Sequence, residues 1–324
     1  MSTTLVIGGN GFIGSQVVRN LLREGHTVRC LVRKTSRTDR LDGLNLELVH
    51  GDLRDAESLY CACVGCASIV HLGGISAWSQ IASPEMFPVV VEGTRNVLAA
   101  AKANGVKRLV YVSSAAALGP CFSPLTRGEN APFSAGDATG MIYVLAKREA
   151  ENLCLNATAD GLEAVIVRPA EVYGPDDRDL VTAGNLVEML RSSPVLVCAG
   201  GTSVIHVQDA ANGIVRALMQ GRSGEVYLLG GENLHHRELA GLLLELANRQ
   251  ASIVTVPASL LRFGASMASM LHLPFPIPPP VVPYATRYWF VDSTKAQREL
   301  GIRFRSARET LSDTLTWLKS TGTV

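Results

Sequence analysis

Short apolar runs alternate with longer amphipathic stretches through the first half of the chain. Runs rich in valine, leucine and isoleucine predict buried strands at 4–7, 27–32, 46–49, 68–72, 109–113 and 164–168. Apolar residues at helical spacing predict helices at 12–24, 93–104 and 141–155. Strands that alternate with helices form βαβ units, so we expect an α/β fold with a doubly wound parallel sheet.

The regular alternation of apolar runs and amphipathic stretches ends after about residue 170. Short apolar pieces with glycine and proline fill 172–203, whereas 251–291 is almost uncharged and contains Pro274, Pro276, Pro278, Pro279, Pro280 and Pro283. Other stretches predict a helix at 204–219, a strand at 225–229, a helix at 237–248 and a helical, amphipathic tail at 295–319. We expect a large domain of 1–171 plus about 204–230, and a smaller lobe of about 172–203 and 231–324.

The composition is that of a globular protein without a strong electrostatic field. Of 324 residues, 47% are hydrophobic and 18% charged, and 30 basic residues balance 29 acidic ones. Neither nucleic acid nor a membrane is therefore expected as a partner. No signal peptide is visible, and prolines and Arg262 interrupt 251–291 as a membrane segment. Seven cysteines without framework spacing indicate reduced thiols in a soluble, cytoplasmic protein.

A glycine-rich loop lies between the first predicted strand and the first predicted helix. Glycines there let the backbone turn tightly and approach a pyrophosphate, while the helix N-terminus supplies free N–H groups. Similar turns occur without a ligand, but this context favours a dinucleotide site in a Rossmann-type domain. We assign to cofactor binding the residues Gly8, Asn10, Gly11, Phe12, Ile13 and Gly14.

The end of the second predicted strand indicates which dinucleotide binds. NAD sites commonly place an acidic residue there to bind the ribose 2′-hydroxyl. This chain instead has Arg33 and Lys34, with Arg37 nearby and no acid before Asp39. These cations suit the extra phosphate of NADP, so we expect NADPH rather than NAD. The alternative is a solvated basic turn.

The next two strand ends are also assigned to the cofactor. Asp52 and Leu53 follow the third strand, where Asp52 could face the adenine or cap the next helix. Leu72 and Gly73 lie at the end of the fourth strand.

Tyr143 and Lys147 are the candidate proton-transfer pair. On a helix, residues four apart lie on one face, and a neighbouring ammonium can lower the pKa of a tyrosine toward working pH. Ser113 and Ser114 end a strand at the sheet edge where α/β folds bind ligands, so a hydroxyl there could hold a substrate carbonyl. The serines could equally cap a turn.

In this order, the glycine loop, the serines and the Tyr-x-x-x-Lys pair resemble the extended short-chain dehydrogenase/reductase family, which includes NAD-dependent epimerases and dehydratases. The resemblance covers nearly the whole chain. It is carried by Gly8 to Gly14, Gly51-Asp52-Leu53, Glu92-Gly93-Thr94, Ser113-Ser114, Tyr143/Lys147, Arg168-Pro169, Val172-Tyr173-Gly174-Pro175, Ile205 to Asp209 and Glu299-Leu300-Gly301.

The resemblance implies a role for each matching residue. Ser114, Tyr143 and Lys147 would be catalytic, with Tyr143 as general acid and Lys147 also bonded to the nicotinamide ribose. Ser113 and Tyr143 would also belong to the cofactor site. The segment from Pro169 to Val172 would line the nicotinamide. Family members are often homodimers through the helices near 93–104 and 143–155. The resemblance implies a structural role for His206 and Asp209.

Two departures from the sugar-nucleotide branch favour a carbonyl reductase, and a third is a departure from the pattern of the whole family. Glu171 stands where those enzymes usually offer an asparagine to the diphosphate, and 202–204 lacks their arginine. Val90 replaces the asparagine of the family's Asn-x-x-Gly-Thr motif. Val32-Arg33 and Tyr173-Gly174-Pro175 look like dihydroflavonol reductase-type enzymes, and 251–291 would either line an apolar pocket or only pack.

We therefore expect NADPH-dependent reduction of a ketone or aldehyde on a small, apolar or aromatic substrate. A nucleotide-sugar epimerase or dehydratase holding NAD tightly is the first alternative, and a non-enzymatic NADP-binding regulator is the second. We expect no metal site, because Cys61, Cys63 and Cys66 lack a fourth ligand nearby.

Overall fold

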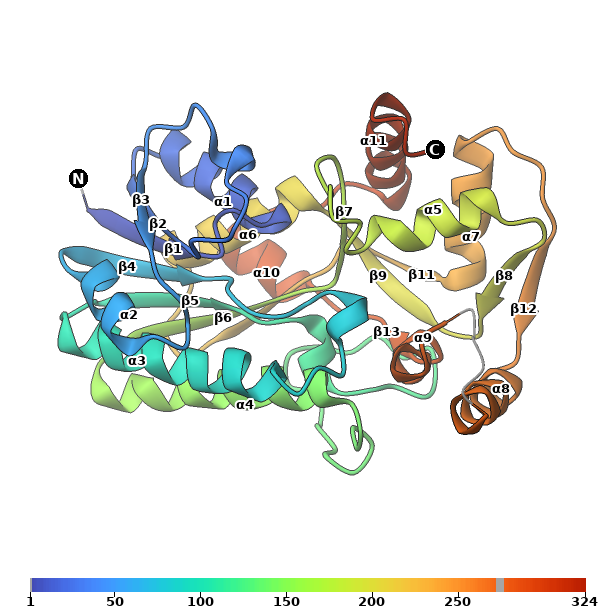
Figure 1. Cartoon of the computed structure of the whole chain (residues 1–324), viewed down its shortest axis with the longest axis horizontal. Coiled ribbons are helices and arrows are strands. Elements are labelled where there is room, and N and C mark those ends of the chain that lie inside the picture. Colours follow the sequence, from blue (N-terminus) through green and yellow to red (C-terminus); the bar gives the residue numbers. More distant parts are fainter. Residues whose placement is uncertain (1, 272–276) are drawn as a thin grey trace.

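A seven-stranded parallel sheet forms the centre of the computed structural model, which describes residues 2–271 and 277–324 (Figure 1). Its order is β10-β6-β5-β4-β1-β2-β3. The strands are β1 (Thr3–Ile7), β2 (Thr27–Val32), β3 (Glu47–His50), β4 (Cys66–His71), β5 (Arg108–Val112), β6 (Glu163–Pro169) and β10 (Val226–Leu229). The expectation of a Rossmann-type doubly wound α/β fold is confirmed.

Helices cover both faces of this sheet, which explains why its strands are continuous apolar runs. One face carries α1 (Phe12–Arg23), α6 (Val207–Gln220) and α10 (Thr294–Leu300) (Figure 1). The other carries α2 (Ala56–Cys63), α3 (Gly93–Ala103) and α4 (Ile142–Asn156).

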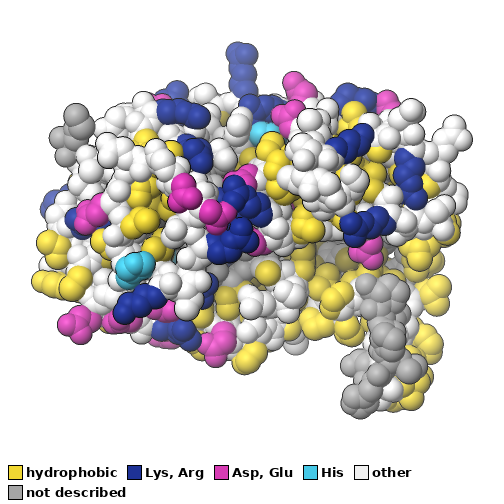
Figure 2. Space-filling view, turned by 45° about the horizontal axis from the view of Figure 1, so that its top comes forward, with side chains coloured by type: hydrophobic (Ala, Val, Ile, Leu, Met, Phe, Trp, Pro, Cys, Tyr) yellow, Lys and Arg dark blue, Asp and Glu magenta, His cyan; other side chains and the backbone are white. Residues whose placement is uncertain are grey.

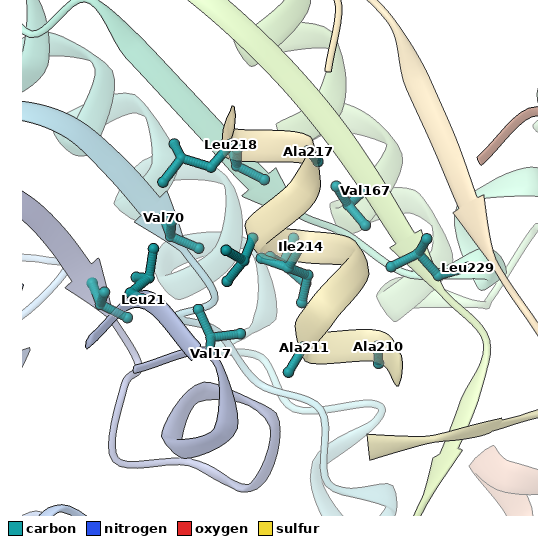
Figure 3. Close-up of a cluster of buried hydrophobic side chains, with 14 of the residues drawn as sticks. Val17, Leu21, Val70, Val167, Ala210, Ala211, Ile214, Ala217, Leu218 and Leu229 are labelled. Carbon is teal, nitrogen blue, oxygen red and sulfur yellow. The ribbon is translucent and has the colours of Figure 1, made fainter. Parts of the chain in front are cut away.

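Small residues bring α6 close to the sheet and to α1. Ile214 of α6 lies in one buried cluster with Val17 and Leu21 of α1 (Figure 3). A Cβ on Gly213 would lie 2.6 Å from Leu229, so only glycine allows this approach. Full burial of each such aliphatic side chain contributes about 1.5–3 kcal/mol.

The smaller lobe is built around β9 (Gly201–His206). β11 (Glu232–His235) pairs with it antiparallel, and β7 (Glu171–Tyr173) and β13 (Tyr288–Trp289) pair with it parallel. A separate pair joins β8 (Val195–Cys198) to β12 (Ile253–Val256).

Helices and short helical turns complete both parts of the chain. The lobe helices are α5 (Ala183–Arg191), α7 (His236–Leu246), α8 (Ala258–Met270), α9 (Val282–Ala285) and α11 (Ala307–Ser320). The short turns are η1 (Asp39–Leu41), η2 (Trp78–Gln80), η3 (Phe87–Glu92), η4 (Ala115–Leu118), η5 (Ala157–Asp160) and η6 (Pro279–Val281).

The chain passes from the large sheet to the lobe and back. It leaves the sheet at the end of β6, forms β7, α5, β8 and β9, and returns through α6 to β10 on the outer edge of β6. The lobe therefore stands beyond the carboxyl ends of the large sheet's strands (Figure 1).

Most predicted elements of the large domain are confirmed to within two residues, but two predictions were wrong. Residues 204–206 belong to β9, and α6 starts only after His206, whose Nδ1 accepts from Gln208 N. The tail forms two helices: Gly301, at φ +62°, ends α10, and Ser306 caps α11. Pro274 and Pro276 lie outside the described residues. Within those residues, no helix is long and apolar enough to cross a membrane.

Candidate active site

Gly8 and Gly11, in the loop after β1, and Gly14, in the first turn of α1, have different roles. Gly8 has φ +84°, and a Cβ there would lie 3.0 Å from Gly73 N, in the loop after β4. A Cβ on Gly14 would lie 2.0 Å from Gly8 O, so packing alone excludes a side chain. At Gly11 the nearest contact would be Gly8 O at 3.3 Å, and no side chain caps the helix. Gly11 therefore leaves the N-terminus of α1 open to a phosphate.

Asn10 and the first residues of α1 connect this loop to neighbouring parts of the domain. Asn10 Nδ2 donates to Arg37 O at 3.0 Å, and Phe12 and Ile13 pack partly buried against the core. The side chain of Asn10 thus joins the glycine loop to the basic turn after β2.

Arg33 and Lys34 are exposed at the carboxyl end of β2. Neither forms an ion pair with a carboxylate of the described residues, whereas Arg37 lies 3.3 Å from Asp39. Two unpaired cations near a free helix N-terminus match the chemistry of a phosphate-bearing dinucleotide. Across the wider surface, basic and acidic side chains are intermixed (Figure 2).

The carboxylate of Asp52 binds Arg54 and does not cap the next helix. Its Oδ1 accepts from Arg54 N at 2.9 Å and Arg54 Nε at 3.1 Å. These bonds, with the charge of Arg33, hold the pKa of Asp52 below its usual value. The cap of α2 is Asp55.

Leu53 lies in the loop after β3, and Leu72 lies directly after β4. Leu53 is almost buried and contacts Gly93. A Cβ added at Gly93 would lie 2.9 Å from Leu53 Cβ. Leu72 N donates to Ile7 O at 2.9 Å.

Tyr143 and Lys147 lie one turn apart on α4, as the spacing predicts. Lys147 is 4% exposed, while Tyr143 is half-buried. Lys147 Nζ donates to Val112 O at 3.2 Å and lies 6.0 Å from the centre of the Tyr143 ring. The last residue of β5 thus holds the ammonium beside the tyrosine.

The pKa shifts of this pair differ from the expectation. Burial raises the pKa of Tyr143, and a side-chain hydrogen bond with Ser114 opposes that rise. The charge of Lys147 is not among the causes of this shift, so the expected lowering is not observed. Burial lowers the pKa of Lys147 to about 8, with Glu151 acting in the opposite direction.

The two serines after β5 differ in their contacts. Ser114 is half-buried, and its Oγ accepts from Ala116 N at 3.2 Å, so it caps η4. The same hydroxyl lies near enough to Tyr143 to oppose the rise of its pKa. Ser113 is buried, its N donates to Val167 O, and its Oγ has no hydrogen-bond partner in the described part of the chain. The capping interpretation of Ser114 and its place beside the tyrosine are therefore compatible.

A buried ion pair anchors α4 to the strand that leads into the lobe. Arg168 Nε and Nη2 donate to the two Glu151 oxygens at 2.7 and 2.6 Å. Both side chains are 1% exposed. Glu151 lies one turn beyond Lys147, so this pair fixes the helix that carries the catalytic candidates.

Pro169 and Val172 lie at the end of β6 and in β7, and Val172 is buried. Between them, Glu171 points into the lobe. Its Oε1 accepts from Tyr173 Oη at 2.7 Å and Asn185 Nδ2 at 3.1 Å. Burial lowers the pKa of nearby His236, with the Glu171 charge opposing.

Aromatic side chains from the 251–291 stretch lie next to Tyr143. Tyr284 packs in one cluster with Tyr143 and Trp289. Its ring stacks on Trp289 at 6.1 Å and meets the edge of Trp78 at 5.7 Å. The part of this stretch around Tyr284 and Trp289 therefore lies beside Tyr143.

His71, His206 and Asp209 belong to the framework rather than to this cluster. His71 is buried, and its Nε2 lies 3.2 Å from Thr94 Oγ1, which itself donates to Val90 O. Asp209 binds Arg305 at 2.6 Å. Among the described residues, no three His, Cys, Asp or Glu side chains are grouped to hold a metal ion.

Sequence reasoning missed Arg40, Glu151, Asn185, His236 and Tyr284. Arg40 is 8% exposed, and Nη1 donates to Asn10 O while Nη2 pairs with Asp179 at 3.2 Å. It thereby joins the glycine loop to the loop after β7. Only Glu151 carried a sequence signal, as an acid at helical spacing after Lys147.

Comparison with known proteins places the chain in a family. Residues 4–230 match the model of the NAD dependent epimerase/dehydratase family. The chain belongs to this family. Its members depend on a nicotinamide cofactor and include reductases, dehydratases and epimerases.

Individual family members resemble the chain over most of its length. It is 32% identical to a putative dihydroflavonol 4-reductase of Synechocystis sp., over 98% of this chain and 95% of that protein. It is 30% identical to a farnesyl-dihydroquinoline-oxide ketoreductase of Stigmatella aurantiaca, over 83% and 80%. A solved dTDP-glucose 4,6-dehydratase of Streptomyces venezuelae, with NAD bound, has TM-score 0.80, 27% identity, and 98% and 97% coverage.

Proposed function

We propose that this family member is an NADPH-dependent reductase of ketones or aldehydes. The observation that carries the proposal is the meeting of Ser114, Tyr143 and Lys147 at the carboxyl edge of the sheet, with Glu171 at the adjoining strand end. The names of the Synechocystis and Stigmatella relatives support a reductase over an epimerase.

Tyr143 is the proton donor in this proposal. A raised pKa keeps its phenol protonated near neutral pH, so Tyr143 Oη can protonate the substrate oxygen. Ser114 Oγ donates a second hydrogen bond to that oxygen. The Lys147 ammonium stabilises the negative charge that develops there. Bound NADPH supplies the hydride.

The cofactor preference rests on charge. Arg33 and Lys34 form no ion pair with a carboxylate among the described residues. The additional phosphate on the ribose of NADP would give them an anionic partner. Gly8, Gly11 and Gly14 seat the pyrophosphate at the start of α1.

The substrate is apolar or aromatic near the reacting carbon. Trp78 and Trp289 pack on Tyr284, which is buried beside Tyr143, and both keep aromatic surface that a substrate could contact. A diphosphate would meet the Glu171 carboxylate and no cation at 202–204, which disfavours a nucleotide sugar.

The assembly and the compartment are part of the same proposal. Leu98 of α3 and Leu153 and Leu155 of α4 remain partly exposed on the outer helix layer, which suits a homodimer through these helices. Light scattering in solution would test it. All seven cysteines are free thiols, as in a cytoplasmic protein.

The deciding experiment measures net cofactor oxidation. Purified protein is mixed with NADPH or NADH and a panel of ketones, aldehydes, UDP-glucose and dTDP-glucose. We expect NADPH loss at 340 nm (the absorbance of reduced nicotinamide) with carbonyl substrates. Conversion of a nucleotide sugar without net oxidation would identify an epimerase or dehydratase. Cofactor binding without any turnover would identify a regulator.

A further inference from the structure

The backbone and the side chain of Arg40 contact different parts of the molecule. Its main chain lies in η1, where Arg40 O accepts from Arg19 Nη2 of α1 at 2.8 Å. The next residue, Leu41, packs into the core of the large domain. The side chain of Arg40 ends at the loop between β7 and α5, and only 8% of it is exposed. Arg40 is therefore anchored on the cofactor side and reaches the first segment of the lobe.

The guanidinium of Arg40 binds two loops at once. Its Nη1 donates to Asn10 O in the glycine loop at 3.4 Å. Its Nε and Nη2 donate to Asp176 O at 3.3 and 3.1 Å, and Nη2 also pairs with Asp179 Oδ2 at 3.2 Å. A buried guanidinium that loses its acceptors is costly, so movement of either loop away from Arg40 is penalised.

The loop that receives Arg40 depends on contacts outside its own backbone. Asp176 and Leu180 have φ values of +75° and +49°, a region that residues other than glycine adopt only at a cost. The buried carboxylate of Asp177 accepts from three backbone N–H groups at the entry to α5, at 2.9–3.0 Å. Residues 174–182 thus determine how β7 continues into α5, and Arg40 ties them to the large domain.

A second contact joins the same two parts of the molecule, but it is exposed. Arg178 pairs with Asp39, and the two side chains are 39% and 37% exposed. Arg178 also pairs with Asp176 of its own loop. Exposed ion pairs of this kind contribute little. Arg40 is therefore the stronger link between the glycine loop and residues 174–182.

The position of Asn10 connects this link to the cofactor. Asn10 lies between Gly9 and Gly11, in the loop assigned to the pyrophosphate. A dinucleotide bound at the open N-terminus of α1 orders this loop. An ordered Asn10 O holds the Arg40 guanidinium, and the guanidinium in turn holds Asp176 O. By thermodynamic reciprocity, order in the loop after β7 also favours dinucleotide binding.

We propose that Arg40 couples occupancy of the dinucleotide site to the order of residues 174–182. The bound dinucleotide stabilises this segment, and the segment strengthens dinucleotide binding. Arg40 is a positioning residue in this coupling, because it acts through Asn10 and Asp176. The inference concerns the cofactor site that the family shares, so it applies to NADP and NAD alike and does not require the proposed reductase function.

The test measures hydrogen exchange along the full chain by mass spectrometry, without dinucleotide and with saturating NADP⁺ or NAD⁺. Calorimetric titration sets the saturating concentration for each protein. In the wild type, both 8–14 and 174–182 should exchange more slowly with dinucleotide. The second segment should slow at least about fivefold, the lower end of usual coupling factors. In Arg40→Met at saturation, 8–14 should still slow, whereas 174–182 should not respond.

Two further variants control for folding and for the general loss of an arginine. Arg40→Lys keeps the charge and the buried stem but lacks the planar fork, so it should also lose most of the response at 174–182. It replaces Arg40→Met if that protein does not fold. Arg249→Met is the matched control, because Arg249 binds Met189 O and Ser192 O at the opposite end of α5. It should keep the full response.

A double-mutant cycle tests the reciprocal effect. In the described part of the chain, the hydrogen bonds of Asp177 stay within its own loop and the start of α5. Asp177→Asn should nevertheless weaken dinucleotide binding about fivefold in the wild-type background. In the Arg40→Met background, the same substitution should change the calorimetric Kd little, because the link is already broken.

Three outcomes would overturn the inference. The first is protection of 8–14 without any change at 174–182 in the wild type. The second is an undiminished response at 174–182 in Arg40→Met or Arg40→Lys, which indicates direct contact between this segment and the dinucleotide. The third is an equal effect of Asp177→Asn on Kd in both backgrounds. None of these readouts depends on turnover, so a failure of the proposed reductase function is detected separately.

Discussion

The cofactor side and the substrate side of the candidate site differ in charge and in construction. On the cofactor side, consecutive loop residues present backbone N–H groups, and Arg33 and Lys34 add unpaired positive charge. On the substrate side, Glu171 and Asn185 come from different elements and present acceptors. Under the proposed function, the first side suits a phosphate-bearing ligand, whereas the second disfavours one.

Tyr143→Phe tests whether both sides serve one reacting centre. Loss of the proton donor should reduce kcat by about 10³-fold, within the range for general acids. Affinity for NADPH should stay unchanged, because the phenol contacts neither the glycine loop nor the basic turn. Stopped-flow turnover and fluorescence titration of NADPH measure the two effects. Near wild-type turnover would refute the proton-donor role.

Arg33→Asp should reverse the charge of the cofactor side. We expect KM for NADPH to rise by about 10²-fold, as for loss of a charge-assisted hydrogen bond plus repulsion, with little change for NADH. Lys107→Asp, exposed at the opposite end of the sheet, is the control. Equal effects on both cofactors would contradict the assignment of the 2′-phosphate.

Two alanine substitutions should separate ligand contact from packing within the glycine loop. In Gly11→Ala the Cβ would lie 3.3 Å from Gly8 O, a slightly tight contact, so NADPH affinity should fall about tenfold while Tm falls much less than in Gly14→Ala. Gly14→Ala places a Cβ against Gly8 O and should lower Tm strongly. Thermal melts without cofactor and NADPH titrations compare them. The same Tm loss in both variants would remove the distinction.

The smallest expected effect is a change in pH dependence. Because burial lowers the pKa of Lys147 to about 8, its charge is present below that pH and lost above it. Therefore kcat/KM should fall as pH rises through about 8. In Lys147→Arg, which stays charged, the residual activity should not show this decline. A pH profile that stays flat to pH 10 in the wild type would contradict the role of the ammonium.

The cofactor side could be predicted from the sequence because its chemistry is local. The glycine loop is one segment, and Tyr143 and Lys147 share a helix face by their spacing alone. The same holds for most strands of the large sheet, whose apolar runs are buried on both faces.

The substrate side could not be predicted, because its residues meet only through the tertiary fold. Asn185, His236 and Tyr284 carry no shared spacing, and their contacts depend on how α5, α7 and α9 pack. Two local signals were overlooked. Gly301 could have marked the end of α10, and Ser306 with Glu309 forms a capping box at the start of α11.

The return of the chain to β10 has a consequence for synthesis on the ribosome. When residues up to Pro169 have emerged, β6 can pair with β5 on one side only. The partner on its other side, β10, comes only after the first lobe strands have been made. Helix α6, which packs against α1, is also absent until residues beyond Val207 have been made. Until β10 docks, the nascent chain exposes an apolar edge of the kind that pairs with other chains, so a nascent or truncated product ending before β10 should depend on chaperones.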